Sequence, residues 1–190
     1  MSFVLKTIHM TLDPASIENA LREVEEFEKI LKPAMTHLID RLAAKGVEVA
    51  RAELLFLSGG PAYMSGALSG SIKYESEEGH AQITAGEGLE TKYGSYAMFV
   101  EYGTGFEGAT NELPEATQEG YSYDVHHHDK HGWWYPAPWG WFEADDGQPL
   151  AWTRGMPPRP FMHNTMHDLE AEAEMNGARI IAEYIADHRG

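Results

Sequence analysis

The chain has 190 residues and no cysteine, which excludes disulfide bridges and thiolate metal sites. No apolar run approaches the about 18 residues that a membrane-spanning helix needs. The opening residues, MSFVLKTIHMTLDP, carry one lysine in a broken apolar pattern that does not fit a secretory signal. The length suits one domain that can bury a core without covalent cross-links. We therefore expect a soluble protein that stays where it is made.

Positive charge is also scarce. The chain has fourteen Lys and Arg residues and thirty Asp and Glu residues, which gives a net charge of -16 at pH 7. Affinity for nucleic acids depends largely on lysine and arginine side chains that replace counterions along the phosphate backbone, so we expect no binding of DNA or RNA. The charge would keep the protein soluble. The sequence leaves open whether it also forms a surface that repels DNA.

Helical spacing of apolar residues dominates both ends of the chain. Asp13 and Pro14 look like an N-cap and a first turn. The stripe that follows comprises Ile17, Ala20, Leu21, Val24, Phe27 and Leu31, and after Pro33 it continues to about Leu57. Pro33 is expected to interrupt or restart this helix. A second long helix is predicted from Pro160, in its first turn, to about Tyr184. We interpret both stripes as ordinary core packing.

Strand-like segments punctuated by glycine lie mostly between the two helices. The predicted strands are residues 3–12, Ser71–Ser76, Ala81–Ala85 and Tyr96–Tyr102. Residues 105–153, rich in Gly, Pro, His and aromatic residues, are interpreted as an inserted loop with a hairpin around Trp133–Phe142. The order predicts an α+β fold in one domain spanning residues 1–190. Its antiparallel sheet would pack against the long helix of the N-terminal half, with the C-terminal helix beside it.

Residues His126–His131, with the sequence HHHDKH, could offer ligands for zinc or nickel. A built metal site needs ligands fixed by further partners, and histidines bunched in one loop point in different directions. The Gly103–Gly108 segment matches GxGxxG, but the acidic stretch broken by proline after it is not the helix start that dinucleotide binding requires. We predict no catalytic residue, no cofactor and no metal. A metal-dependent hydrolase or metal-binding module on the His126–His131 loop is the alternative.

Three short segments then occur in a suggestive order. They are SGALSGSI (Ser65–Ile72), YAMFVEYGT (Tyr96–Thr104) and TRGMPPRPFM (Thr153–Met162). Together they resemble the bacteriophage head–tail joining proteins, also called tail completion or neck proteins. That family typically shows a helix, a (T/S)GxLxxSI-like segment, a YAxxVExGT segment and a Pro-Phe start to a C-terminal helix. The resemblance covers roughly residues 15 to 175, with residues 105–150 as a variable insertion.

The resemblance implies a structural virion protein of the head–tail junction and not an enzyme. Such a subunit would form a ring, with a hexamer favoured because the tail has sixfold symmetry, and would contact other neck and tail proteins. Double-stranded DNA would pass through without specific binding. The protein would be located in the virion neck or tail, after assembly in the host cytoplasm, with no role at a membrane.

The motif residues fall into two predicted sets. The subunit or partner interface would contain Tyr96, Phe99, Glu101, Tyr102, Gly103, Thr104, Trp133, Trp134, Trp139 and Trp141. Residues that maintain the fold would be Gly66, Leu68, Ile72, Pro160 and Phe161. Glu101 beside packed aromatics would need a partner, either a backbone N–H or an arginine such as Arg154 or Arg159.

An acidic lining of the ring would repel DNA and keep it moving. Two acidic groups could supply it, and the sequence does not choose between them. They are Glu18, Glu23, Glu25, Glu26 and Glu28, and Glu107, Glu112, Glu115 and Glu119.

Overall fold

A computed structural model describes residues 10–56, 66–91, 94–118, 120–123, 131–137 and 140–188. The chain divides into two compact units. Unit 1 comprises Met1–Glu48, Tyr74–Ile83 and Met166–Gly190, and unit 2 comprises Val49–Lys73 and Thr84–Thr165. The expected insertion, residues 105–153, falls inside unit 2. No helix among the described residues is both long and apolar enough to cross a membrane.

The N-terminal helix α1 runs unbroken from Pro14 to Phe56. Asp13 caps it as predicted, because its Oδ1 accepts a hydrogen bond from the amide of Ser16 at 2.9 Å. Hydrogen bonds from the Thr11 hydroxyl and then from the Ser16 amide lower the pKa of the Asp13 carboxyl. Pro33 lies inside the helix, so the predicted interruption was wrong. Proline removes one backbone hydrogen bond, and the long helical stretches on either side tolerate that loss.

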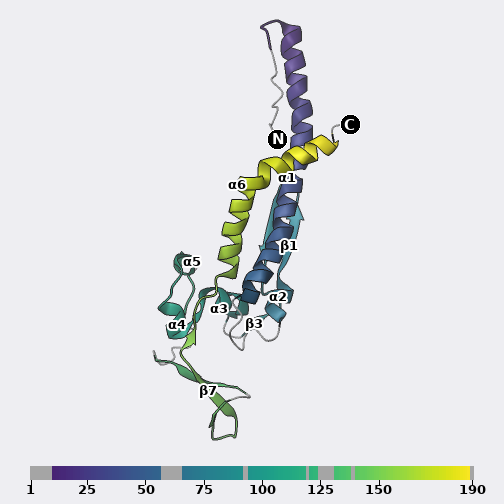
Figure 1. The fold of residues 1–190 in the computed structure, drawn as a ribbon. Coiled ribbons are helices and arrows are strands. Elements are labelled where there is room, and N and C mark those ends of the chain that lie inside the picture. Colours follow the sequence, from purple (N-terminus) through teal and green to yellow (C-terminus); the bar gives the residue numbers. More distant parts are fainter. Residues whose placement is uncertain are drawn as a thin grey trace. The chain divides into compact units, whose positions relative to one another are not determined.

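Unit 1 is built from the first part of α1, the C-terminal helix α6 (Phe161–His188) from Met166 onward, and a hairpin of β1 (Lys73–Glu77) and β2 (His80–Thr84) (Figure 1). Gly46 allows close packing, since a Cβ there would lie 2.9 Å from Leu169 Cδ1 and closer still to Ile83. A Cβ at Gly177 would lie 3.5 Å from Leu38 Cδ2, which is an ordinary van der Waals contact. Lys45 joins the two helices through an ion pair with Glu172 at 3.0 Å.

Unit 2 contains several short elements. They are α2 (Ala67–Ser71), β3 (Glu90–Thr91), β4 (Gly94–Ser95), α3 (Tyr96–Tyr102), α4 (Gly105–Ala109), α5 (Pro114–Gln118), β5 (Trp133–Pro136), β6 (Phe142–Glu143), β7 (Pro149–Thr153) and β8 (Gly155–Met156). β7 is the centre of a three-stranded antiparallel sheet of order β5-β7-β6. Leu54, Ile72 and Phe161 are the largest fully buried apolar side chains of this unit.

The α+β prediction is confirmed: a long helix lies in the N-terminal half, another at the C-terminus, and small antiparallel sheets lie between them. Tyr96–Tyr102 was wrongly predicted as a strand. It forms α3, in which Ala97, Val100 and Glu101 are buried at helical spacing.

Other boundaries also differ from the predictions. Ser71 ends α2, so the strand starts at Lys73. The hairpin pairs β6 with β7 across a turn in which Gly147 N–H donates to Ala144 O at 2.9 Å. β5 pairs with β7 and not with β6. Helix α6 begins at Phe161, directly after Pro160. Residues 10–12 form no strand, and residues 3–9 of that predicted strand lie outside the described part.

Candidate functional site

The second and third sequence motifs meet at the start of α6. Glu101, only 7% exposed, accepts hydrogen bonds from two amides in the first turn of that helix. Oε2 lies 2.9 Å from Met162 N, and Oε1 lies 3.0 Å from His163 N. These amides have no intrahelical partner, and the positive end of the helix dipole favours a carboxylate there. A glutamate 61 residues before Met162 therefore caps α6, and its partners are backbone N–H groups, one of the two kinds of partner expected for it.

Backbone contacts complete this junction. Arg159 N–H lies 2.9 Å from Val100 O and 3.2 Å from Glu101 O, so it donates to the end of α3. Gly103 adopts a φ of 79°, and a Cβ at this position would lie 2.8 Å from Pro158 N and 2.9 Å from Gly108 Cα. Glycine is required here both by conformation and by space. Thr104 forms an isolated antiparallel bridge with Met156. We call these contacts the motif junction.

The first motif is attached to α1 within unit 2. Arg51 Nη2 donates to Ile72 O at 2.8 Å, and its Nε donates to Ser69 O at 3.1 Å. Gly66 has a φ of 63°, and Leu68 and Ile72 are buried. Phe161 is buried as well, and Pro160 is half-buried directly before α6. Arg51 was not singled out from the sequence, because a lone arginine on a helix has no distinguishing spacing.

Aromatic rings surround the motif junction on one side. Tyr121 lies 5.2 Å from Tyr102, 6.5 Å from Phe99 and 5.1 Å from Tyr123 between ring centroids. The Tyr121 hydroxyl donates to Gly103 O. Burial, and then the neighbouring Tyr123, raise the pKa of Tyr121. Because Glu101, Tyr102 and Gly103 are buried inside unit 2, they shape the fold and are not open to a partner. Tyr96, Phe99 and Thr104 are half-buried.

The tryptophans of the predicted interface separate onto opposite faces of the β5-β7-β6 sheet. Trp133 packs against Gly105, where a Cβ would lie 2.7 Å from its Cη2. Trp134, the next residue, is 39% exposed, as the alternation of side chains along a strand requires. Trp141 is 75% exposed. Trp139 lies outside the described residues.

Three exposed rings lie around Trp134, which is itself exposed. Its ring centroid lies 5.0 Å from Trp141, 5.1 Å from Phe142 and 5.4 Å from Trp152, its direct cross-strand partner. We call Trp134, Trp141, Phe142 and Trp152 the aromatic surface. Phe142 and Trp152 were not among the residues predicted for the interface. The alternation in β7 could have found Trp152, had its pairing with β5 been known.

The described residues contain no group of three or more His, Cys, Asp or Glu side chains placed to hold a metal ion. Of the His126–His131 loop, residues 126–130 lie outside the described part, and His131 is exposed. Two acidic residues near the motif junction have a basic neighbour: Arg154 lies 3.5 Å from Glu107, and His163 lies 3.4 Å from Glu115.

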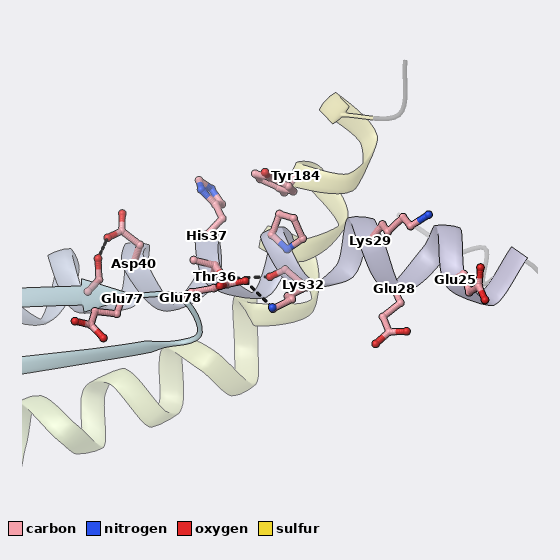
Figure 2. A pocket seen from close by; sticks show the side chains of 12 residues that line it. Glu25, Glu28, Lys29, Lys32, Thr36, His37, Asp40, Glu77, Glu78 and Tyr184 are labelled. Atoms are coloured by element: carbon pink, nitrogen blue, oxygen red, sulfur yellow. Dashed lines mark hydrogen bonds and ion pairs between the residues drawn. The ribbon is translucent and has the colours of Figure 1, made fainter. Parts of the chain in front are cut away.

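Unit 1 holds an open groove of about 900 Å³ between α1, the β1–β2 turn and the end of α6. Figure 2 shows that charged side chains line it. Lys32 Nζ contacts Glu78 Oε1 at 2.6 Å, and this pairing raises the pKa of Lys32 and lowers that of Glu78. His37 and Tyr184 face each other with centroids 5.0 Å apart. These pairings give the groove no evident reactive group among the described residues.

No protein-family model, no curated protein and no solved structure matches this chain.

Proposed function

We propose that this chain is a structural subunit of the head–tail junction of a tailed bacteriophage. The proposal rests on the ordered motifs and on their geometry. The YAMFVEYGT and PRPFM segments are joined through Glu101 and Arg159, so these motif residues build one compact unit. Motif residues that stabilise the fold are consistent with a structural subunit, because such a protein acts by binding its neighbours through surfaces and not through reactive groups.

The aromatic surface is the observation that carries the proposal. Large apolar rings are the residues that dominate protein–protein contacts, and a contiguous group of them exposed on a soluble chain usually marks an interface. Trp134 and its three neighbours offer such a group on a hydrogen-bonded sheet, which holds them in fixed positions. In a ring, each subunit would dock this surface on a different patch of the next subunit. A hexamer is the proposed state.

The net charge of -16 supports the proposed passage of DNA. A ring lined by carboxylates would repel the duplex, whereas lysines and arginines would bind phosphates and slow it. The protein would assemble in the host cytoplasm and reside in the neck of the virion.

The test replaces Trp141 and Trp152 by serine in a phage that carries this gene, with Leu55→Ser as the control. Leu55 is also exposed and lies in unit 2, but outside the aromatic surface. We expect the double variant to fold and to leave heads and tails unjoined in electron micrographs, while the control joins them. Normal virions from the double variant would contradict the role of this surface. A single copy of the chain in the assembled neck would contradict the ring.

A further inference from the structure

The chain contains one Asp-Gly pair and one Asn-Gly pair, and the structure places them in different surroundings. Asp146-Gly147 lies in the turn between β6 and β7, whereas Asn176-Gly177 lies inside α6. Such pairs react without an enzyme, because the glycine nitrogen attacks the side-chain carbonyl carbon of the residue before it, and glycine has no side chain to crowd that nitrogen. In an unfolded chain the Asn-Gly pair reacts faster, because an amide carbon is a better electrophile than the carbon of an ionised carboxylate.

The turn between β6 and β7 is open and held by few contacts. Asp146 and Gly147 are both exposed, and Gly147 adopts a φ of 80°. Gly147 N–H donates to Ala144 O at 2.9 Å, and Asp146 Oδ1 accepts from Gln148 N–H at 3.1 Å. Both hydrogen bonds must break before Gly147 N reaches Asp146 Cγ. Because β6 is only two residues long, this turn opens by a local fluctuation that leaves the rest of unit 2 folded.

The long helix α6 holds Asn176 and Gly177 in place. It has 28 residues, and the amides of its interior donate to carbonyls one turn earlier. Gly177 is buried beside Leu38 of α1, and Asn176 Oδ1 accepts a hydrogen bond from Arg179 Nη2 at 3.4 Å. An attack by Gly177 N requires the middle of this helix to open where it packs on α1. The fold therefore reverses the order in which the two pairs react in an unfolded chain.

We propose that Asp146 is a site of spontaneous isomerisation and that Asn176 is protected by the fold. In the first step Gly147 N bonds to Cγ of the protonated Asp146 carboxyl group, the nitrogen loses its proton, and one carboxyl oxygen leaves as water. Water then opens the resulting succinimide at either carbonyl. Opening at the side-chain carbonyl restores aspartate, and opening at the main-chain carbonyl gives isoaspartate. One water leaves and one is added, so the conversion needs no oxidant and no co-reactant.

Isoaspartate at residue 146 alters the aromatic surface. Its backbone runs through Cβ and Cγ, which adds one carbon atom to the turn and displaces the carboxylate that accepts from Gln148 N–H. This turn sets the register in which Phe142 pairs with Leu150. Phe142 lies 5.1 Å from Trp134 between ring centroids, so a changed turn moves one ring of the aromatic surface. The proposal does not depend on the proposed role in a phage.

The test incubates the purified full chain at neutral pH, both folded and in guanidinium chloride, and maps its peptides by mass spectrometry. An isoaspartate peptide keeps its mass, changes its elution time and resists a protease that cleaves before aspartate. Deamidation of Asn176 raises the mass of its peptide. We expect isoaspartate at residue 146 to appear first in the folded chain, whereas deamidation of Asn176 should come first in guanidinium chloride.

Three variants test the chemistry. Asp146→Glu should abolish the product, because the longer side chain would have to close a larger and less favoured ring. Asp146→Asn should form isoaspartate faster in the folded chain, because its amide is the better electrophile. Asn176→Gln is the control and should leave the rate at residue 146 unchanged. In the separated isoaspartate form of the natural sequence, the amides of residues 142–148 should exchange with deuterium faster than in the unmodified chain.

Three outcomes would overturn the proposal. The first is deamidation of Asn176 ahead of isomerisation at residue 146 in the folded chain. The second is an absence of isoaspartate at residue 146 in the folded chain after a peptide of residues 140–152 has largely isomerised under the same conditions. The third is unchanged amide exchange over residues 142–148 in the isoaspartate form, which would contradict the effect on the aromatic surface.

Discussion

Replacing Glu101 by alanine should destabilise unit 2 more than any change to an exposed carboxylate. Alanine removes both hydrogen bonds to Met162 N and His163 N and leaves those amides without this acceptor. Hydrogen bonds to a charged group contribute about 1.5–3 kcal/mol each, and a carboxylate at a helix N-terminus adds up to about 2 kcal/mol. These contributions overlap, so we expect the free energy of unfolding to fall by about 3–5 kcal/mol.

Urea unfolding followed by tryptophan fluorescence measures this loss. All five tryptophans lie between residues 133 and 152, inside unit 2, so their emission reports on the unit that contains Glu101. Glu101→Gln keeps one carbonyl oxygen but loses the charge, and should cost about 1–2 kcal/mol. Glu174→Ala on the exposed side of α6 is the control, with a change within about 0.5 kcal/mol. If Glu101→Ala came within about 1 kcal/mol of this control, the capping role of Glu101 would be refuted.

Three further predictions concern other parts of the molecule. Gly103→Ala should destabilise unit 2 by at least about 2 kcal/mol, because Pro158 and Gly108 crowd the new Cβ. Gly88→Ala, at a similar φ of 76° with nothing within 4 Å of the new Cβ, should cost only about 1 kcal/mol, and equal losses of the two variants in urea unfolding would contradict the effect of crowding. Burial raises the pKa of Tyr121 above its ordinary value of 10.0, so the unfolded chain loses this proton at a lower pH than the folded chain, and the free energy of unfolding should fall as pH rises above about 10. Tyr121→Phe should reduce this loss of stability with pH, and an unchanged pH dependence in the variant would contradict the prediction. The purified chain should not retard double-stranded DNA in a gel even at low salt, because its charge is repulsive; a retarded band would argue against an acidic DNA path.

The sequence predicted the long elements well and the short ones poorly. Helix α1 and helix α6 follow from apolar spacing over many turns, and Asp13 marks the start of α1 because a capping side chain acts locally. Tyr96–Tyr102 has seven residues, too few for the spacing to separate a helix from a strand. Its helical form depends on contacts distant in sequence, such as the hydrogen bonds from the start of α6 to Glu101.

The candidate site was also predicted only in part from the sequence. The exposure of Trp134 and the packing of Trp133 against Gly105 depend on which face of the sheet is covered, and neighbouring residues cannot determine this. The pairing of β5 with β7, and not with the nearer β6, brings Trp152 beside Trp134. The apolar spacing at the start of α1 was interpreted as core packing, but Leu21, Val24 and Phe27 are exposed, because spacing along a helix does not say which part of its apolar face is covered.

Pro33 gives α1 an uneven resistance to hydrogen exchange. Proline cannot donate to the carbonyl of Lys29, so the helix lacks one internal hydrogen bond at this point. Most helical stability in proteins comes from packing of one face, and Leu21, Val24 and Phe27 in the part of α1 before Pro33 are exposed. Amides before Pro33 should therefore exchange with deuterium through local opening, while those near Ala43 and Ala50 exchange only when larger parts of the fold open.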